Sequence, residues 1–176
     1  KVLYLGISDT PAWVVAQANT LADLRGWTPF TALQLRYSLI DRSAERDLLP
    51  MARELDLAVT PLSVPGAGVL SGKYNRARSE AGRAKAGAAT VERNRDIAQR
   101  VIEVAEEIGC SPAQVAIAWA RQQHGVIIPL VGARTAEQLR DNLGAADVEL
   151  TDEQLARLDE VSRIDLGFPH TFLGRD

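Results

Sequence analysis

Three polar residues in the C-terminal part of the chain have a spacing that favours nucleotide binding. Arg134, Gln138 and Asn142 recur every four residues, which would place them along one stripe of a helix. The residues before them, 126–131, form a short apolar run typical of a fully buried strand, and Gly132 ends this run. A guanidinium beside a helix N-terminus favours a bound phosphate, and two amides can recognise adenine. The alternative interpretation is a solvated helix face that carries an arginine by chance.

Four strand-then-helix units follow one another and would position these residues. The predicted strands span 2–8, 30–37, 57–63 and 126–131. The predicted helices span 11–25, 43–55, 90–108, 111–123, 135–146 and 151–162. This alternation predicts an α/β protein with a parallel sheet covered by helices, which is either a small open sheet or half of an eight-stranded barrel. We find no linker between these units, so residues 1–176 are interpreted as one domain.

One predicted helix and one predicted loop bear on the shape of the site. The helix that begins near Thr135 is expected to pack on the strand before it, because Leu139, Leu143 and Ala146 share one of its faces. Residues 75–89 carry many Arg, Lys, Gly and Ala and few large apolar side chains. We interpret them as a surface loop of the kind that often covers a site.

Polar residues follow all four predicted strands. The carboxyl ends of parallel strands meet at one edge of a sheet or barrel, and ligands bind at that edge. The residues at these ends are Ser8 with Asp9, Gln34 with Tyr37, Ser63 with the Gly-rich stretch 66–74, and Gly132 with Arg134. This agreement predicts one shared site built from all four strand ends.

Composition limits the classes of protein that remain. The chain has 176 residues, is 46% hydrophobic and 24% charged, and carries a net charge of −3. These values are typical of a soluble domain, predict no nucleic-acid-binding surface, and leave no stretch apolar enough for a membrane helix. The one cysteine, Cys110, excludes an internal disulfide and fits a reducing cytoplasm, and no Cys/His cluster has metal-ligand spacing. The chain starts at Lys1 and its only methionine is Met51, which predicts a piece of a longer protein.

Four motifs, in order along the chain, resemble the aldo-keto reductase superfamily. They are Gly6-Ile7-Ser8-Asp9, Leu33-Gln34-Leu35-Arg36-Tyr37-Ser38, Gly68-Val69-Leu70-Ser71-Gly72-Lys73-Tyr74, and Val131-Gly132-Ala133-Arg134 through Gln138 to Asn142. Members of that family are (β/α)8 barrels of the TIM-barrel type that transfer a hydride between NADPH and a carbonyl compound, without a metal. The resemblance implies that this chain is about half of such a barrel, its C-terminal half with strands five to eight and extra helices.

The resemblance also implies which residues bind NADP(H). Ser8, Asp9 and Gln34 would hold the nicotinamide carboxamide, which needs both donors and acceptors. Arg134 would pair with the 2′-phosphate, while Gln138 and Asn142 would face the adenine. The residues expected to border the pyrophosphate are Ser63, Gly68, Leu70 and Lys73. The other candidates for the cofactor site are Tyr37, Leu62 and Gly132. Simpler structural roles stay open for each of these, such as a helix cap for Ser8 or a core aromatic for Tyr37.

Two departures from the family pattern surround the third strand. The family usually has a Trp or Tyr stacked on the nicotinamide where this chain has Leu62. The usual Ser-Pro-Leu-Ala-Gly-Gly run becomes Ser63-Val64-Pro65-Gly66-Ala67-Gly68, which moves the proline by one position. A leucine can pack on a ring but has no π-face, so these changes predict weaker nicotinamide binding or a differently placed loop.

No catalytic residue is assigned within the chain. The family's catalytic Asp, Tyr, Lys and His belong to strands two to four, and none of those motifs occurs here. The first hypothesis is a cytoplasmic, NADP-dependent aldo-keto reductase acting on a small carbonyl substrate, with this chain as its cofactor-binding half and a tyrosine outside it as general acid. The second is a truncated, non-catalytic NADP-binding or interaction protein that needs the missing N-terminal half, a partner chain or a dimer, since a half barrel leaves open edges. A third is a non-redox enzyme that reuses the pocket.

Overall fold

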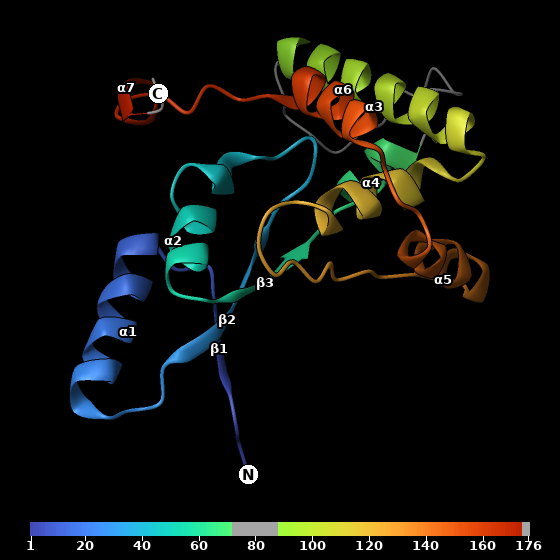
Figure 1. Cartoon of the computed structure of the whole chain (residues 1–176). Helices are drawn as coiled ribbons and strands as arrows, with labels where there is room; N and C mark the ends of the chain where they lie inside the picture. The colour runs from blue at the N-terminus through green and yellow to red at the C-terminus, as the bar shows by residue number, and fades with distance from the viewer. Residues whose placement is uncertain (72–87, 174–176) are drawn as a thin grey trace.

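The sheet of this protein is parallel, and its strands follow chain order. The structure is a computed structural model, and it describes residues 1–71 and 88–173. Its strands, β1 (Leu5–Ser8), β2 (Phe30–Arg36) and β3 (Ala58–Leu62), pair in the order β1-β2-β3 (Figure 1). Both pairs are parallel, which confirms the prediction of a parallel α/β fold.

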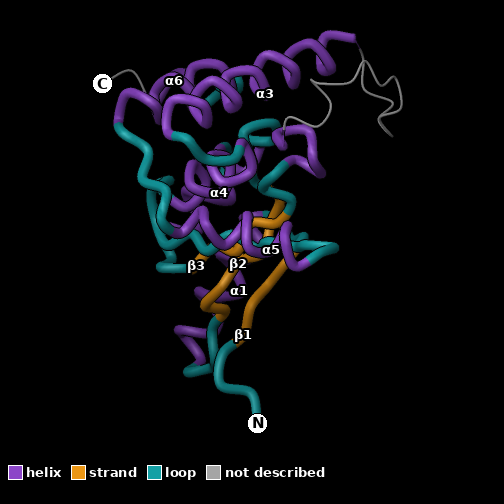
Figure 2. The backbone as a smooth tube through the Cα atoms, turned by 90° about the vertical axis from the view of Figure 1, so that its right-hand side faces the viewer, coloured by secondary structure: helices purple, strands orange, loops and turns teal. Residues whose placement is uncertain are grey.

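The helices form two groups around this sheet. α1 (Ala12–Arg25) and α2 (Leu48–Glu54) pack against one face of the sheet. α3 (Ala88–Ile108) packs on both α4 (Pro112–Arg121) and α6 (Asp152–Ser162), in a group at the end of the molecule farthest from the N-terminus (Figures 1 and 2). The remaining elements are α5 (Ala136–Leu143), α7 (His170–Leu173) and the 3-10 turns η1 (Ser43–Glu45), η2 (Gly66–Ser71) and η3 (Gly144–Ala146).

Capping residues decide where several helices begin. The predicted starts of α4 and α6 are confirmed, because Ser111 and Thr151 both form capping boxes with the glutamine three residues later. The prediction of one helix over 43–55 is wrong. The Asp47 carboxylate accepts a hydrogen bond from the Leu48 N–H at 2.7 Å and starts α2 there, so the residues before it form only the η1 turn.

The predicted fourth strand is a single bridge, Val59 to Ile127. Val59 donates to the Val126 carbonyl and accepts from Ile128, both at 2.8 Å, and Leu130 donates to the Pro61 carbonyl at 2.9 Å. The next bond of a parallel ladder would need an N–H on Pro61, which proline lacks, so the pairing is interrupted there. The prediction of full burial is also wrong, since Val126, Ile128 and Leu130 are 64%, 55% and 43% exposed.

The two faces of the sheet differ in burial. Leu33 and Val59 lie in the core against the helices, at 1% and 4% exposure. Because successive side chains of a strand alternate between faces, Ala32, Gln34 and Thr60 face the other way, and all three are only half-buried. We call this second side, which also includes the exposed Gly6 and the exposed side chains beside β3, the open face.

The expected packing of α5 on the preceding strand is wrong. Leu139 and Leu143 are 42% and 58% exposed, Ala146 is also exposed, and no residue of α5 is buried. Polar contacts with α4 hold α5 in place instead. The Ser111 hydroxyl donates to Asp141 Oδ2 at 2.9 Å, and the Gln114 side chain donates to the Asp141 carbonyl at 2.8 Å. These contacts attach α5 to α4 and leave its apolar stripe uncovered by the described residues.

A network of polar side chains crosses the core beyond the end of β2. Tyr37 Oη and Arg42 Nε both donate to Glu45 Oε1, each at 2.7 Å. Arg42 Nη1 and Trp119 Nε1 both donate to Asp159 Oδ1, at 2.8 and 3.1 Å. The Arg42 guanidinium lies 5.2 Å from the centre of the Trp119 ring, and the Tyr37 ring lies at the same distance from that ring. This network, called the Arg42 network below, joins the end of β2 to α4 and α6.

The Arg42 network predicts how stability depends on alkaline pH. Burial, and then the hydrogen bond to Glu45, raise the pKa of the Tyr37 hydroxyl far above its ordinary value. The unfolded chain loses this proton near pH 10 while the folded chain keeps it, so the contribution is complete below about pH 10 and is lost as the pH rises above it. In Tyr37→Phe, the free energy of unfolding should fall less steeply above that pH, by about 1.4 kcal/mol per pH unit.

Urea denaturation between pH 8 and 11 measures this difference. Tyr4→Phe is the control, because Tyr4 is 77% exposed and its substitution should leave the alkaline slope unchanged. Equal slopes for Tyr37→Phe and the unmodified protein would contradict the prediction.

Candidate functional site

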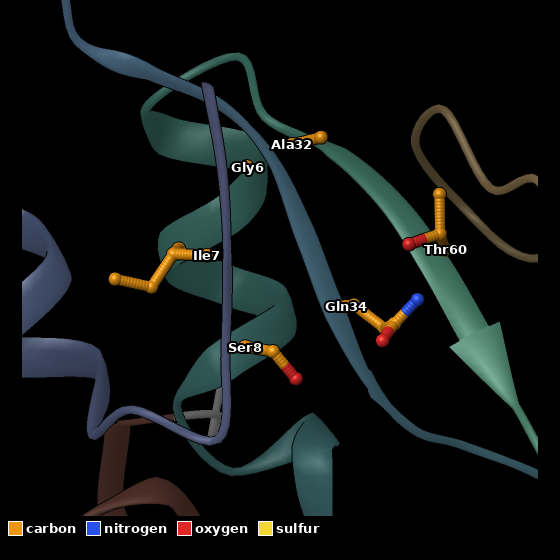
Figure 3. Close-up of a pocket in the computed structure, with 6 residues that line it drawn as sticks. All are labelled: Gly6, Ile7, Ser8, Ala32, Gln34 and Thr60. Carbon is orange, nitrogen blue, oxygen red and sulfur yellow. The ribbon is translucent and has the colours of Figure 1, made fainter.

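Three polar side chains form one row across the open face. Ser8 pairs with Gln34 across β1 and β2, and Gln34 pairs with Thr60 across β2 and β3. Figure 3 shows their side chains on the same side of the sheet, with Ile7 pointing to the opposite side. Gly6 and Ala32 lie two residues before Ser8 and Gln34 in their strands, on the same face. Because both side chains are small or absent, a hollow of about 290 Å³ lies next to the row. The row offers two hydroxyls and one amide, which together can donate and accept hydrogen bonds.

The backbone changes direction sharply where β1 and β3 end. Asp9 and Ser63 have φ angles of 48° and 61°, a left-handed conformation that non-glycine residues rarely adopt. The turn after β1 is held by the Thr10 hydroxyl, which donates to the Ser8 carbonyl at 2.9 Å. The turn after β3 is held by the Gly66 N–H, which donates to the Ser63 carbonyl at 2.8 Å. Strained residues of this kind gather at ligand sites, and both stand at the carboxyl edge next to the row.

A second polar group lies at the start of α5. Gln138 Oε1 accepts from the Arg134 N–H at 2.9 Å, and Asn142 Nδ2 donates to the Gly132 carbonyl at 3.2 Å. Each amide thus uses one end to hold the loop, and its other end has no partner within the described residues. The Thr135 hydroxyl caps the helix by accepting from the Gln138 N–H at 3.2 Å. The Arg134 side chain is exposed and makes no hydrogen bond or ion pair with the described part of the chain.

The structure separates the predicted site residues into two groups and leaves some outside both. Figure 1 shows that the segment leading into α5 runs away from the sheet, so the polar group at the start of α5 (Arg134, Gln138 and Asn142, called the Arg134 group below) and the strands that carry the row are apart. Leu70 is fully buried, and Leu62 is half-buried at the end of β3. Gly68 lies in η2 with a φ of 92°, which only glycine adopts readily. The predicted site residue Lys73 lies outside the residues that the structure describes.

Tyr37 does not join either group. Its side chain is 1% exposed and lies in the Arg42 network, on the side of the sheet opposite Gln34. An odd spacing of three residues along an extended segment places two side chains on opposite faces, which explains the separation.

Two residues that the sequence analysis passed over share the open face with Gln34. Thr60 belongs to the row, and Arg36 follows Gln34 by two residues at the end of β2. The period of two in a strand was the signal that could have found Arg36. For Thr60 the signal was its place in the neighbouring strand, which becomes visible only with the register.

No metal centre is found among the described residues, since none of their His, Cys, Asp and Glu side chains form a group of three that could hold an ion. The described helices also include none that is long and apolar enough to cross a membrane.

Comparisons with known proteins identify the family of this chain. The model of the aldo/keto reductase family matches residues 1–163, and the chain belongs to that family. It is 40% identical over 184 residues to a probable aryl-alcohol dehydrogenase of Saccharomyces cerevisiae, covering 100% of this chain and 55% of the relative. It is 38% identical over 186 residues to an aryl-alcohol dehydrogenase (NADP(+)) of Phanerodontia chrysosporium, covering 99% of this chain and 47% of the relative.

A more distant similarity leads to norsolorinic acid reductase of Aspergillus flavus, at 31% identity over 173 residues, with 98% of this chain and 44% of that protein covered. The chain therefore spans about half the length of the curated relatives it matches. The family is one of oxidoreductases with a (β/α)8 barrel, and the structure of this chain is α/β with a parallel sheet.

Proposed function

We propose that this chain is the cofactor-binding half of an NADP-dependent aldo-keto reductase that transfers a hydride between NADPH and an aldehyde or ketone. The observation that carries the proposal is the row of Ser8, Gln34 and Thr60 at the carboxyl edge of the sheet, in a chain of this family. One similar protein is named for NADP(+), which supports the choice of cofactor. The enzyme would act in the cytoplasm on a small carbonyl compound.

The residues of the row suit a nicotinamide carboxamide. That group has one carbonyl acceptor and an NH2 donor, and both must be held to fix which ring face is presented. The Ser8 hydroxyl and the Gln34 amide can each donate and accept, and Asp9 adds an acceptor in the adjoining turn. When bound, the cofactor supplies the hydride. The residues of this chain would hold the carboxamide and so orient the ring, and the hollow beside Gly6 and Ala32 would leave room near it.

The Arg134 group suits the opposite end of the cofactor. An exposed guanidinium next to a helix N-terminus is a strong partner for a phosphate, and the 2′-phosphate distinguishes NADPH from NADH. Gln138 and Asn142 keep one end of each amide for adenine while the other end holds the loop. The Ser63 turn and Gly68 would border the pyrophosphate, and Leu70 would support them from the core, where it is fully buried. Lys73, which the sequence predicts for the same role, lies outside the described residues.

The remaining parts of the active site would come from outside this chain. Neither tyrosine among the described residues is placed as a general acid, because Tyr37 is buried in the Arg42 network and the exposed Tyr4 precedes β1. We assign proton donation to a tyrosine on the other half of the barrel, with its Lys, Asp and His partners. The open face favours the same arrangement, since a half-covered sheet is completed by further strands.

A second candidate function follows from the open face alone. A chain that exposes Val126, Ile128 and Leu130 beside an open face needs a partner to cover them. It would then be a non-catalytic NADP-binding or interaction protein that acts with a partner chain or as a dimer. Such a protein binds NADPH without reducing a carbonyl compound.

Fluorescence titration of this chain with NADPH, followed by an absorbance assay of benzaldehyde reduction by the complete barrel, that is, this chain together with the half that supplies the tyrosine, tests the proposal. The enzyme hypothesis expects NADPH to bind more tightly than NADH and to be oxidised in the presence of the aldehyde. Gln34→Ala should weaken binding of both nucleotides by about 10-fold through loss of the carboxamide bonds, whereas Gln17→Ala, on the exposed side of α1, should not. Binding without turnover would select the second function, and no binding of either nucleotide would refute both.

A further inference from the structure

Arg36 is a cation that faces the proposed site and has no partner among the residues that the structure describes. It is the last residue of β2 and follows Gln34 by two residues, so the alternation of the strand places both on the open face. It pairs in register with Leu62 of β3, whereas β1 ends at Ser8, opposite Gln34. Arg36 therefore stands at the rim of the open face, beyond the end of β1 and beside the turn that contains Asp9.

The charge of Arg36 is not used within the described part of the chain. Its side chain is exposed and makes no hydrogen bond, ion pair or ring contact with the described residues. By contrast, Arg42, which also follows β2, forms ion pairs with Glu45 and Asp159. Asp9 is the neighbouring acidic residue on this edge, and it forms no ion pair with Arg36.

The position of Arg36 suits the substrate better than the nicotinamide. Two residues along a strand advance about 6.6 Å, so Arg36 lies one step nearer the carboxyl edge than the carboxamide partner Gln34. A carbonyl compound that meets the ring from the open side has its far end at this rim. A guanidinium there forms paired, charge-assisted hydrogen bonds with a carboxylate, a geometry that a neutral group cannot match.

We propose that Arg36 determines substrate specificity by binding a carboxylate at the far end of the carbonyl substrate. This inference rests on the proposed function, because it assumes that the row of Ser8, Gln34 and Thr60 holds the nicotinamide and that the carbonyl compound meets the ring from the open face. It assigns the substrate class as an aldehyde or ketone that also carries a carboxylate.

Two aldehydes that differ only in charge test this assignment. They are 4-carboxybenzaldehyde and its neutral methyl ester, methyl 4-formylbenzoate. The protein assayed is the complete barrel, in which this chain is joined by the half that supplies the tyrosine. The unmodified protein should reduce the acid with the higher kcat/KM, and Arg36→Gln should lower that value for the acid by about 10-fold while leaving the ester unchanged. Arg36→Lys should keep part of the preference, since it keeps the charge but not the paired geometry. Arg95→Gln, which removes an exposed arginine of α3, is the matched control.

Other outcomes separate the two levels of the proposal. An equal loss for acid and ester, or a weaker affinity for NADPH in Arg36→Gln, would overturn the substrate role of Arg36. If the unmodified protein reduced neither aldehyde, the proposed function would fail. Calorimetric titration of the NADPH-saturated protein with benzoate and with benzamide then tests, independently of turnover, whether Arg36 binds a carboxylate. Binding of benzoate that is lost in Arg36→Gln supports the carboxylate site, and equal affinity of both proteins for benzoate rejects it.

Discussion

Replacing Arg134 by alanine should weaken NADPH binding by about 10- to 100-fold and leave NADH binding unchanged, because charge-assisted hydrogen bonds to a phosphate are lost. The two nucleotides differ only in the 2′-phosphate, so the comparison isolates that group. The loop should keep its shape in the variant, because Gln138 bonds the main-chain N–H of Arg134 and not its side chain. Fluorescence titration of both nucleotides at low and at high salt measures the change.

A second arginine, on the helix that follows Arg134, provides the control for this experiment. Arg140 is exposed on α5, and its substitution by alanine removes the same charge about one helical turn beyond the start of that helix. Arg140→Ala should change neither affinity beyond about 2-fold, the scale of a screened surface charge. If Arg134→Ala weakened NADPH and NADH equally, the residue would hold the loop and not the phosphate. An unchanged preference for NADPH would reject the role altogether.

The largest effect on stability is expected from Arg42. Its side chain is only 11% exposed and donates to both Glu45 and Asp159. Arg42→Ala would leave two carboxylates without their shared counter-charge, one of them largely buried, and would remove the cation from the face of Trp119. Breaking a buried ion pair from one side costs about 3–5 kcal/mol, so urea denaturation should show a loss of that size in the free energy of unfolding.

An exposed ion pair of similar geometry is the comparison for Arg42. Arg157 donates two hydrogen bonds to Glu107, at 2.7 and 3.0 Å, but both side chains are more exposed than Arg42. Arg157→Ala should cost less than about 1 kcal/mol, as is usual for surface pairs. Similar losses for the two variants would mean that burial does not strengthen the Arg42 network. A double variant, Arg42→Ala with Glu45→Ala, would recover part of the loss if the unpaired carboxylate is its cause.

Much of the fold could be predicted where local chemistry is decisive. Ser111 and Thr151 mark helix starts by the side chains they carry, and the structure has both capping boxes. The prediction of a fourth strand was wrong because strand pairing depends on the neighbouring strand, and Pro61 of that strand has no N–H to donate. The prediction that Leu139 and Leu143 pack on the strand was wrong. An apolar stripe shows that one face of a helix is apolar, but it does not show whether another element covers that face.

In the candidate site, too, local patterns could be predicted, and contacts that depend on other elements could not. Ser8 and Gln34 were predicted together because strand ends share one edge, and the register places them opposite each other. Tyr37 was grouped with them by nearness in sequence, but the alternation of side chains sends it into the core. Arg36 was read only as part of a motif, although the period of two in β2 already placed it beside Gln34.

The missing donor at Pro61 has a mechanical consequence for the molecule. The main chain of 126–130 is joined to β3 by three hydrogen bonds, with a gap in the middle of the ladder. Because this pairing has fewer hydrogen bonds, separating 126–130 from β3 should cost less free energy than separating β2 from β3, which pair continuously. We therefore expect the segment that leads to Arg134 to separate from β3 more readily than β2 does, and amide hydrogen exchange should be faster in 126–130 than in β2.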